Sequence, residues 1–166
     1  MSDFNKPARV FWSFRQVCTQ DAGGGGYLTV YVTPAAGSMM KIINATHAAS
    51  GNRAVTQYLC NADVVTMVVL NTIAAVAAAT CVIPTPGSAA GVTNGNIATI
   101  GLEICAPSFY AGIVTAAAVT ETATCMINAE LFGTRTAPTV SWAGSGGTPS
   151  PIAATENTIT IVPGEY

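Results

Sequence analysis

Short segments in which apolar and polar residues alternate recur along most of this chain of 166 residues. In "YLTVYVT", residues 27–33, Leu28, Val30 and Val32 fall on one side, and tyrosines and threonines fall on the other. This period of two is typical of a β-strand with one buried face. Turn signals recur at about 10-residue spacing and predict roughly seven to nine short strands, so the expected fold is all-β, a jelly roll or related antiparallel β-sandwich.

The turns and loops of this sandwich can be placed from glycine, proline and asparagine. Gly51-Asn52 is predicted to be the turn of a hairpin, because both residue types tolerate positive φ. Residues 84–96 are predicted to be a loop that contains the type I′ turn signal Asn94-Gly95. The alanine-rich residues 74–83 fit either a short helix or a strand. The predicted strands of the body are residues 27–33, 38–48, 53–60, 64–70, 97–105, 108–119 and 122–133.

Both ends of the chain differ in composition from this body. Residues 1–26 combine an aromatic segment with a Gly-rich turn, and "RVFWSFRQVC", residues 9–18, fits either a first strand or a docking arm. Residues 134–166 are rich in Pro, Gly, Ser and Thr and end in the alternating segment "NTITIV". Such a segment has little with which to build a core, so we expect an extended C-terminal arm that orders on a neighbour. The expected organisation is therefore a sandwich body over residues 27–133 with an extended arm at each end.

Charge is scarce. Asp, Glu, Lys and Arg make up 8% of the residues, against about 25% in ordinary soluble domains. Residues 54–134 contain no Lys or Arg and the formal net charge is −2, which argues against nucleic acid as a partner. Because charge normally keeps proteins apart in solution, a surface this poor in charge is consistent with one that partners cover.

Cysteine usage and hydropathy limit the cellular setting. The five cysteines form no CxxC pair, which favours buried free thiols in a reducing compartment. The N-terminus lacks the apolar run of a signal peptide. Residues 64–83 are uncharged and long enough to span a bilayer, but they contain Asn71 and three threonines and have no nearby basic residues. We therefore expect no membrane partner.

The sequence offers little for catalysis. His47 is the only histidine, so any Ser-His or Cys-His device would need it, and no acidic residue lies near it in sequence to orient its ring. In the predicted strand 38–48 it shares its parity with Lys41 and Ile43. The chain has no GxSxG motif and no metal-ligand spacing. We expect no catalytic residue, no metal and no cofactor, and we expect Arg53 to brace the turn or a subunit contact.

Residues 27–70 carry a resemblance to a known group of proteins. An apolar strand, "PAAG", a strand of mixed residues, a small-residue loop and "GNR" opening another strand follow one another, and "TCMINAELFG" looks like the closing strand of the same pattern. This order resembles small structural proteins of tailed-bacteriophage virions, which look like jelly-roll decoration (cement) proteins of the capsid.

The resemblance implies a non-enzymatic virion protein. Such a protein would be made in the host cytoplasm, bind the outer surface of the assembled capsid through the major capsid protein, form a homotrimer and stabilise the shell. The alternative is a carbohydrate-binding or host-attachment module of a phage fibre or tail. The residues expected to contact capsid or neighbouring copies are Phe11, Trp12, Phe14, Arg15, Arg53, Trp142, Ile159, Ile161 and Tyr166.

Overall fold

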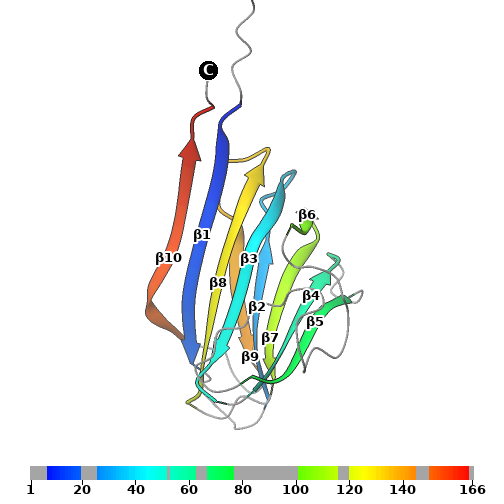
Figure 1. Cartoon of the computed structure of the whole chain (residues 1–166), viewed down its shortest axis with the longest axis vertical. Helices are drawn as coiled ribbons and strands as arrows, with labels where there is room; N and C mark the ends of the chain where they lie inside the picture. The colour runs from blue at the N-terminus through cyan, green and yellow to red at the C-terminus, as the bar shows by residue number, and fades with distance from the viewer. Residues whose placement is uncertain are drawn as a thin grey trace, which may run out of the picture.

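The computed structural model describes residues 7–19, 26–51, 53–62, 67–76, 101–115, 120–144 and 150–164. In this part of the chain there are only β-strands, arranged as two five-stranded antiparallel sheets that pack face to face (Figure 1). The prediction of an all-β sandwich is confirmed. Among the described residues, no helix is long and apolar enough to cross a membrane.

Ten strands make up the two sheets. Their bounds are β1 Arg9–Thr19, β2 Tyr27–Thr33, β3 Met39–Ala49, β4 Arg53–Cys60, β5 Met67–Val76, β6 Glu103–Cys105, β7 Phe109–Thr115, β8 Thr122–Phe132, β9 Thr139–Gly144 and β10 Ser150–Val162. The first sheet has the order β10-β1-β8-β3-β6, and the second has the order β5-β4-β7-β2-β9. We call them sheet A and sheet B.

The pairing of the first eight strands is nested. β1 pairs with β8, β2 with β7, β3 with β6 and β4 with β5, as if one long hairpin had been rolled up. This nested order is the arrangement of a jelly roll. The last two strands extend it on one side, because β9 pairs with β2 and β10 pairs with β1.

The core lies between the inner faces of the two sheets. In β1, β2 and β8, every second residue points inward, as the pleat requires, and the exposed fractions of these residues are close to zero. Trp12 and Phe14 belong to this core, with ring centroids 5.4 Å apart. The largest cluster contains Val10, Trp12, Phe14, Val30, Val32, Met40, Ile42, Ala45, Leu70, Ile104, Tyr110, Cys125, Ile127, Ala129 and Leu131.

The terminal segments contribute strands to the sandwich. Residues 9–19 form β1, between β10 and β8, so "RVFWSFRQVC" is a strand of the sandwich. Residues 139–144 and 150–162 form β9 and β10, whereas the composition of residues 134–166 predicts an extended arm with only a short terminal strand. The predicted loop 84–96 and much of the alanine-rich segment lie outside the described residues, while residues 67–76 form β5.

The predicted hairpin at Gly51-Asn52 is wrong. β3 belongs to sheet A and β4 to sheet B, so the chain crosses from one sheet to the other at this point. The crossing is held by the start of β8: the Ser50 amide donates to the Thr122 carbonyl, and the Thr122 amide donates to the Ser50 hydroxyl, each at 3.0 Å. Turn residues specify a change of direction but do not specify which sheet the next strand joins, which is why this prediction failed.

The cysteines of the described chain are free thiols. Cys18, Cys60 and Cys125 are buried, and Cys105 is exposed. Burial raises the pKa of the Cys18 thiol to about 12 and that of Cys60 to about 11. The three buried thiols are therefore protonated and unreactive at neutral pH. Cys81 lies outside the described residues.

Candidate interaction surfaces

His47 lies inside the sandwich and is 2% exposed. Its Nε2 atom is 2.6 Å from the Tyr110 hydroxyl, which comes from β7 of the opposite sheet. The side chain of Gln57 hydrogen-bonds Tyr110 from β4. A buried polar cluster thus joins three strands across the core. The role of this cluster is structural: its members are buried polar groups, which are stable only when their hydrogen bonds are satisfied within the protein.

Glycine makes room for this histidine. A Cβ atom added to Gly112 of β7 would overlap the His47 ring. The burial of the ring lowers the pKa of His47 to about 4, so the imidazole is neutral at pH 7. Because the ring is covered by the chain itself, no substrate can reach it in the folded sandwich.

A β-bulge explains why His47 faces inward. The register between β3 and β8 shifts between Ile42 and Asn44. Simple alternation would place His47 on the same face as Lys41 and Ile43, both of which lie on the outer surface of sheet A. The extra residue at Ile43 reverses the parity, so His47 enters the core while Ile43 stays 44% exposed.

Arg53 forms a two-pronged ion pair with Glu121. Its Nε donates to Oε2 at 2.8 Å, and one terminal nitrogen donates to Oε1 at 2.5 Å. Gly51 allows this pair, because a Cβ atom at that position would overlap the Glu121 carboxylate. Arg53 opens β4 in sheet B, and Glu121 precedes β8 in sheet A, so the pair fastens the two sheets together at the crossing. Arg53 thus reaches a neighbouring carboxylate, as predicted, but the pair braces a crossing between two sheets and not a hairpin. The alternative role of Arg53 in a subunit contact stays a prediction.

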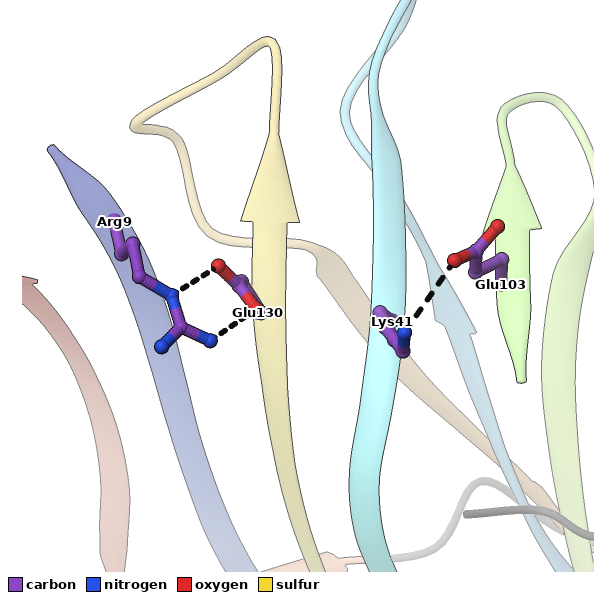
Figure 2. Close-up of polar contacts among 4 residues, drawn as sticks. All are labelled: Arg9, Lys41, Glu103 and Glu130. Atoms are coloured by element: carbon purple, nitrogen blue, oxygen red, sulfur yellow. Dashed lines mark hydrogen bonds and ion pairs between the residues drawn. The ribbon is translucent and has the colours of Figure 1, made fainter. Parts of the chain in front are cut away.

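A row of opposite charges crosses the outer face of sheet A (Figure 2). Arg9 on β1 donates two hydrogen bonds of 2.7 Å to Glu130 on β8. Lys41 on β3 lies opposite Glu130 and is 3.6 Å from Glu103 on β6. The hydrogen bonds from Arg9, its charge and the charge of Lys41 lower the pKa of Glu130. The row spans four neighbouring strands with alternating sign, so its charges are balanced within the chain.

One end of this row borders a shallow hollow. The hollow lies where β1 begins and β8 ends, and its lining includes Arg9, Glu130, Phe132 and Arg135. Phe132 is 38% exposed there. An exposed aromatic ring beside two guanidinium groups is a composition that occurs often at protein interfaces.

Aromatic side chains gather on the outer face of sheet B. Tyr31 of β2 and Tyr58 of β4 lie opposite Ala111 of β7 from its two sides. Both pack against the cluster of Cys60, Phe109 and Ala111, and the rings of Tyr31 and Phe109 meet edge to face with centroids 5.8 Å apart. Tyr27, further along β2, is 44% exposed.

The residues predicted as contacts, apart from Arg53, fall into four groups. Trp12 and Phe14 are core residues, 0% and 3% exposed, so their assignment as partner contacts is corrected: sheet B and β10 already cover them. Trp142 and Ile159 are half-buried against the same core. Phe11 and Arg15 lie on the outer side of β1, and Ile161 on β10 is 43% exposed. Tyr166 lies outside the described residues.

Two hydrogen bonds attach the added strands to β1. The Trp12 indole donates to the Asn157 side chain of β10 at 2.7 Å, and the Trp142 indole of β9 donates to Gln16 of β1 at 3.2 Å. Both tryptophans are among the predicted contact residues, but the partners of their indole groups come from more than 120 residues away along the chain. No local pattern indicates such pairs.

Comparison of the chain with known protein families, curated proteins and solved structures finds no match to any of them.

Proposed function

We propose that this chain is a non-enzymatic structural protein of a bacteriophage virion, which binds the outer surface of the assembled capsid as a decoration protein. The observation that carries the proposal is the distribution of charge. Of the six basic residues, Arg9, Lys41 and Arg53 already pair with glutamates of the same chain. Little charge therefore remains on this surface to repel other proteins, which suits a chain that functions while it is packed against neighbours.

The phage setting rests on the resemblance of residues 27–70 to virion proteins, and the jelly-roll order of the strands is compatible with it. The buried position of His47 supports a role without catalysis, since the only histidine is shielded from any substrate. A protein that binds the assembled shell and not its free subunits stabilises the shell by mass action. Many copies acting together need only a weak contact each.

The contact with the major capsid protein is proposed to involve the outer face of sheet A near the hollow at Phe132 and Arg135. Deletion of residues 136–166 would not test this contact, because it removes β9 and β10 from the sheets. Point variants of surface residues are the correct tool. Phe132→Ser changes the exposed ring, and Ile43→Ser is a matched change of an exposed apolar residue elsewhere on the same face.

The test uses particles of the virus that encodes this chain, prepared with and without the protein. We expect particles that lack it to lose their DNA at a lower temperature, and added wild-type protein to restore the resistance. Phe132→Ser should restore less than Ile43→Ser at equal concentration. Absence of the chain from purified particles, or unchanged heat resistance without it, would refute the proposal.

A second candidate function is carbohydrate binding or host attachment, and the aromatic cluster on sheet B favours it. Tyr27, Tyr31 and Tyr58 offer rings on one outer face, and sugar rings stack on such side chains. A glycan array probed with the wild type and with Tyr27→Ala separates the two functions. Binding that the variant loses supports this candidate, and an array without hits removes it.

A further inference from the structure

β10 is an outermost strand. One of its sides pairs with β1, and among the described strands none pairs with the other side (Figure 1). Alternate backbone N–H and C=O groups along that side therefore point away from the sheet. An edge of this kind is a template for pairing with another strand.

The part of β10 from Asn157 to Val162 lacks the devices that normally protect an edge. These devices are charged residues, prolines and bulges. The register with β1 is regular from Arg9↔Val162 to Arg15↔Glu156, and its irregularity lies beyond Glu156. Glu156 and Pro163 bound the segment, and the residues between them, "NTITIV", are uncharged.

The core-facing side of this segment ends in an open apolar stripe. Ile159 and Ile161 lie opposite Trp12 and Val10, on the inner face of sheet A. Ile159 packs against the core, and Val10 is 7% exposed, but Ile161 is 43% exposed. The apolar layer thus continues to the outermost strand without cover on its last residue.

The sequence of the segment is complementary to itself. In an antiparallel pair, directly opposite residues lie on the same face of the sheet. If a two-fold axis passes through Thr160, Ile159 of each copy lies opposite Ile161 of the other, and Thr158 lies opposite Val162. All of these cross-strand pairs are β-branched and uncharged, which favours pairing. An axis at Ile159 would instead place Asn157 opposite Ile161 and Glu156 opposite Val162.

We propose that a second copy of this chain pairs with β10 in antiparallel orientation, about a two-fold axis at Thr160, and so joins the two five-stranded A sheets into one continuous sheet. Both copies use the same surface, so the contact closes on itself and yields a dimer. The proposal does not rest on the proposed function. It differs from the homotrimer that the resemblance implies.

The first test measures oligomeric state by sedimentation equilibrium over a range of protein concentrations. The wild type should be a dimer that dissociates on dilution. Ile161→Lys places a charge in the paired strand and should raise the dimer dissociation constant at least about tenfold, which is 1.4 kcal/mol. Ile43→Lys is the matched control, because Ile43 is 44% exposed and Ile161 is 43% exposed, but Ile43 lies on β3 inside the sheet. It should dimerise as the wild type does.

The second test fixes the register by disulfide trapping in a Cys81→Ser/Cys105→Ser background, which removes Cys105, the exposed thiol among the described residues, and Cys81, which lies outside them. With the axis at Thr160, the two Cα atoms at this position lie about 4.5–5.5 Å apart, within reach of a disulfide. The two copies of Glu156 would be separated by eight residue steps of about 3.4 Å, or about 27 Å. Thr160→Cys should therefore cross-link under mild oxidation, and Glu156→Cys should not.

Three results would overturn the proposal. The first is a wild-type monomer at every concentration. The second is an oligomer that Ile161→Lys leaves intact while circular dichroism shows the variant to be folded, a trimer included. The third is cross-linking of Glu156→Cys as fast as that of Thr160→Cys. A failure of capsid binding would leave these results unchanged, so the two proposals are tested separately.

Discussion

Acidification from pH 7 to pH 5 should cost the sandwich about 2 kcal/mol of stability through His47 alone, because unfolding lets this residue take up a proton. Its pKa is about 4 in the folded chain, against 6.5 for an ordinary histidine, and burial is the cause. Between these values the unfolded chain binds more protons than the folded one. The contribution is therefore complete above about pH 6.5 and is lost as the pH falls toward 4. One pKa unit corresponds to about 1.36 kcal/mol, so the full loss is roughly 3 kcal/mol.

The groups that face His47 do not reverse this sign. Tyr110 lies against the ring, and Cys125 lies opposite on β8; burial raises the pKa of both, so both are neutral at these pH values. Among the described residues that pack on the ring there is no carboxylate to hold a charged imidazole. The protonated form would therefore be buried without a counter-charge.

Urea unfolding at pH 7 and pH 5 measures the effect, with His47→Gln as the control. The variant retains every carboxylate, so its own loss of stability between the two pH values gives the background. The wild type should lose about 2 kcal/mol more than the variant. If His47→Gln does not fold, Tyr110→Phe serves in its place: it keeps the buried ring, and its stability should still fall with pH. Equal losses in the wild type and His47→Gln, or a flat profile for Tyr110→Phe, would refute the reasoning.

Three further predictions concern single side chains. Arg53→Ala should lower the melting temperature more than Arg9→Ala, since Arg53 is 28% exposed against 62% and joins the two sheets; a larger fall for Arg9→Ala would contradict this. Gly112→Ala should cost on the order of 1–3 kcal/mol in urea unfolding, because the new methyl group overlaps a core ring. Thr29→Val should raise stability by about 1 kcal/mol, since the buried Thr29 hydroxyl has no hydrogen-bond partner in the described structure; a lower urea midpoint would show that the hydroxyl is satisfied.

The sequence predicts the faces of the strands well where alternation is strict. In β2 and β8, apolar residues at every second position are buried and their neighbours are mostly not. This information is local, because the pleat alone decides which side a residue takes. Arg53 was predicted for a similar reason: an arginine at the start of a strand beside a small turn can reach a carboxylate near that turn.

The local alternation of residues predicts neither which sheet a following strand joins nor where a strand contains a bulge. The turn at Gly51 has the composition of a hairpin, but β3 pairs with β8 and β4 pairs with β7, so the choice of sheet is made by partners distant in sequence. His47 is the sharper case. One extra residue at the bulge reverses the face of all that follows, and nothing in "KIINATH" marks the position of that bulge.

β9 was not predicted, because its stability as a strand comes from its packing against the core. "TVSWAG" is short and lies among Pro, Gly and Ser, so it carries no strong strand signal. Its Trp142, however, contacts two clusters of the core. Tertiary packing, and not intrinsic preference, makes this segment a strand.

The two added strands also explain where the open edge of the molecule lies. In a jelly roll of β1 to β8 alone, β1 and β2 would be the outermost strands on one side of the two sheets. β10 covers β1, and β9 covers β2, so the segment after residue 138 closes both edges from within the chain. The outermost strand of sheet A is therefore β10, which has 13 residues against six in β9 and ends in exposed Ile161 and Val162. A strand that only protected an edge of its own chain would be expected to carry a lysine or a proline in its second half too, as β10 carries Pro151 in its first half. Because Asn157–Val162 contains neither, the last strand is better understood as the surface that meets the next copy.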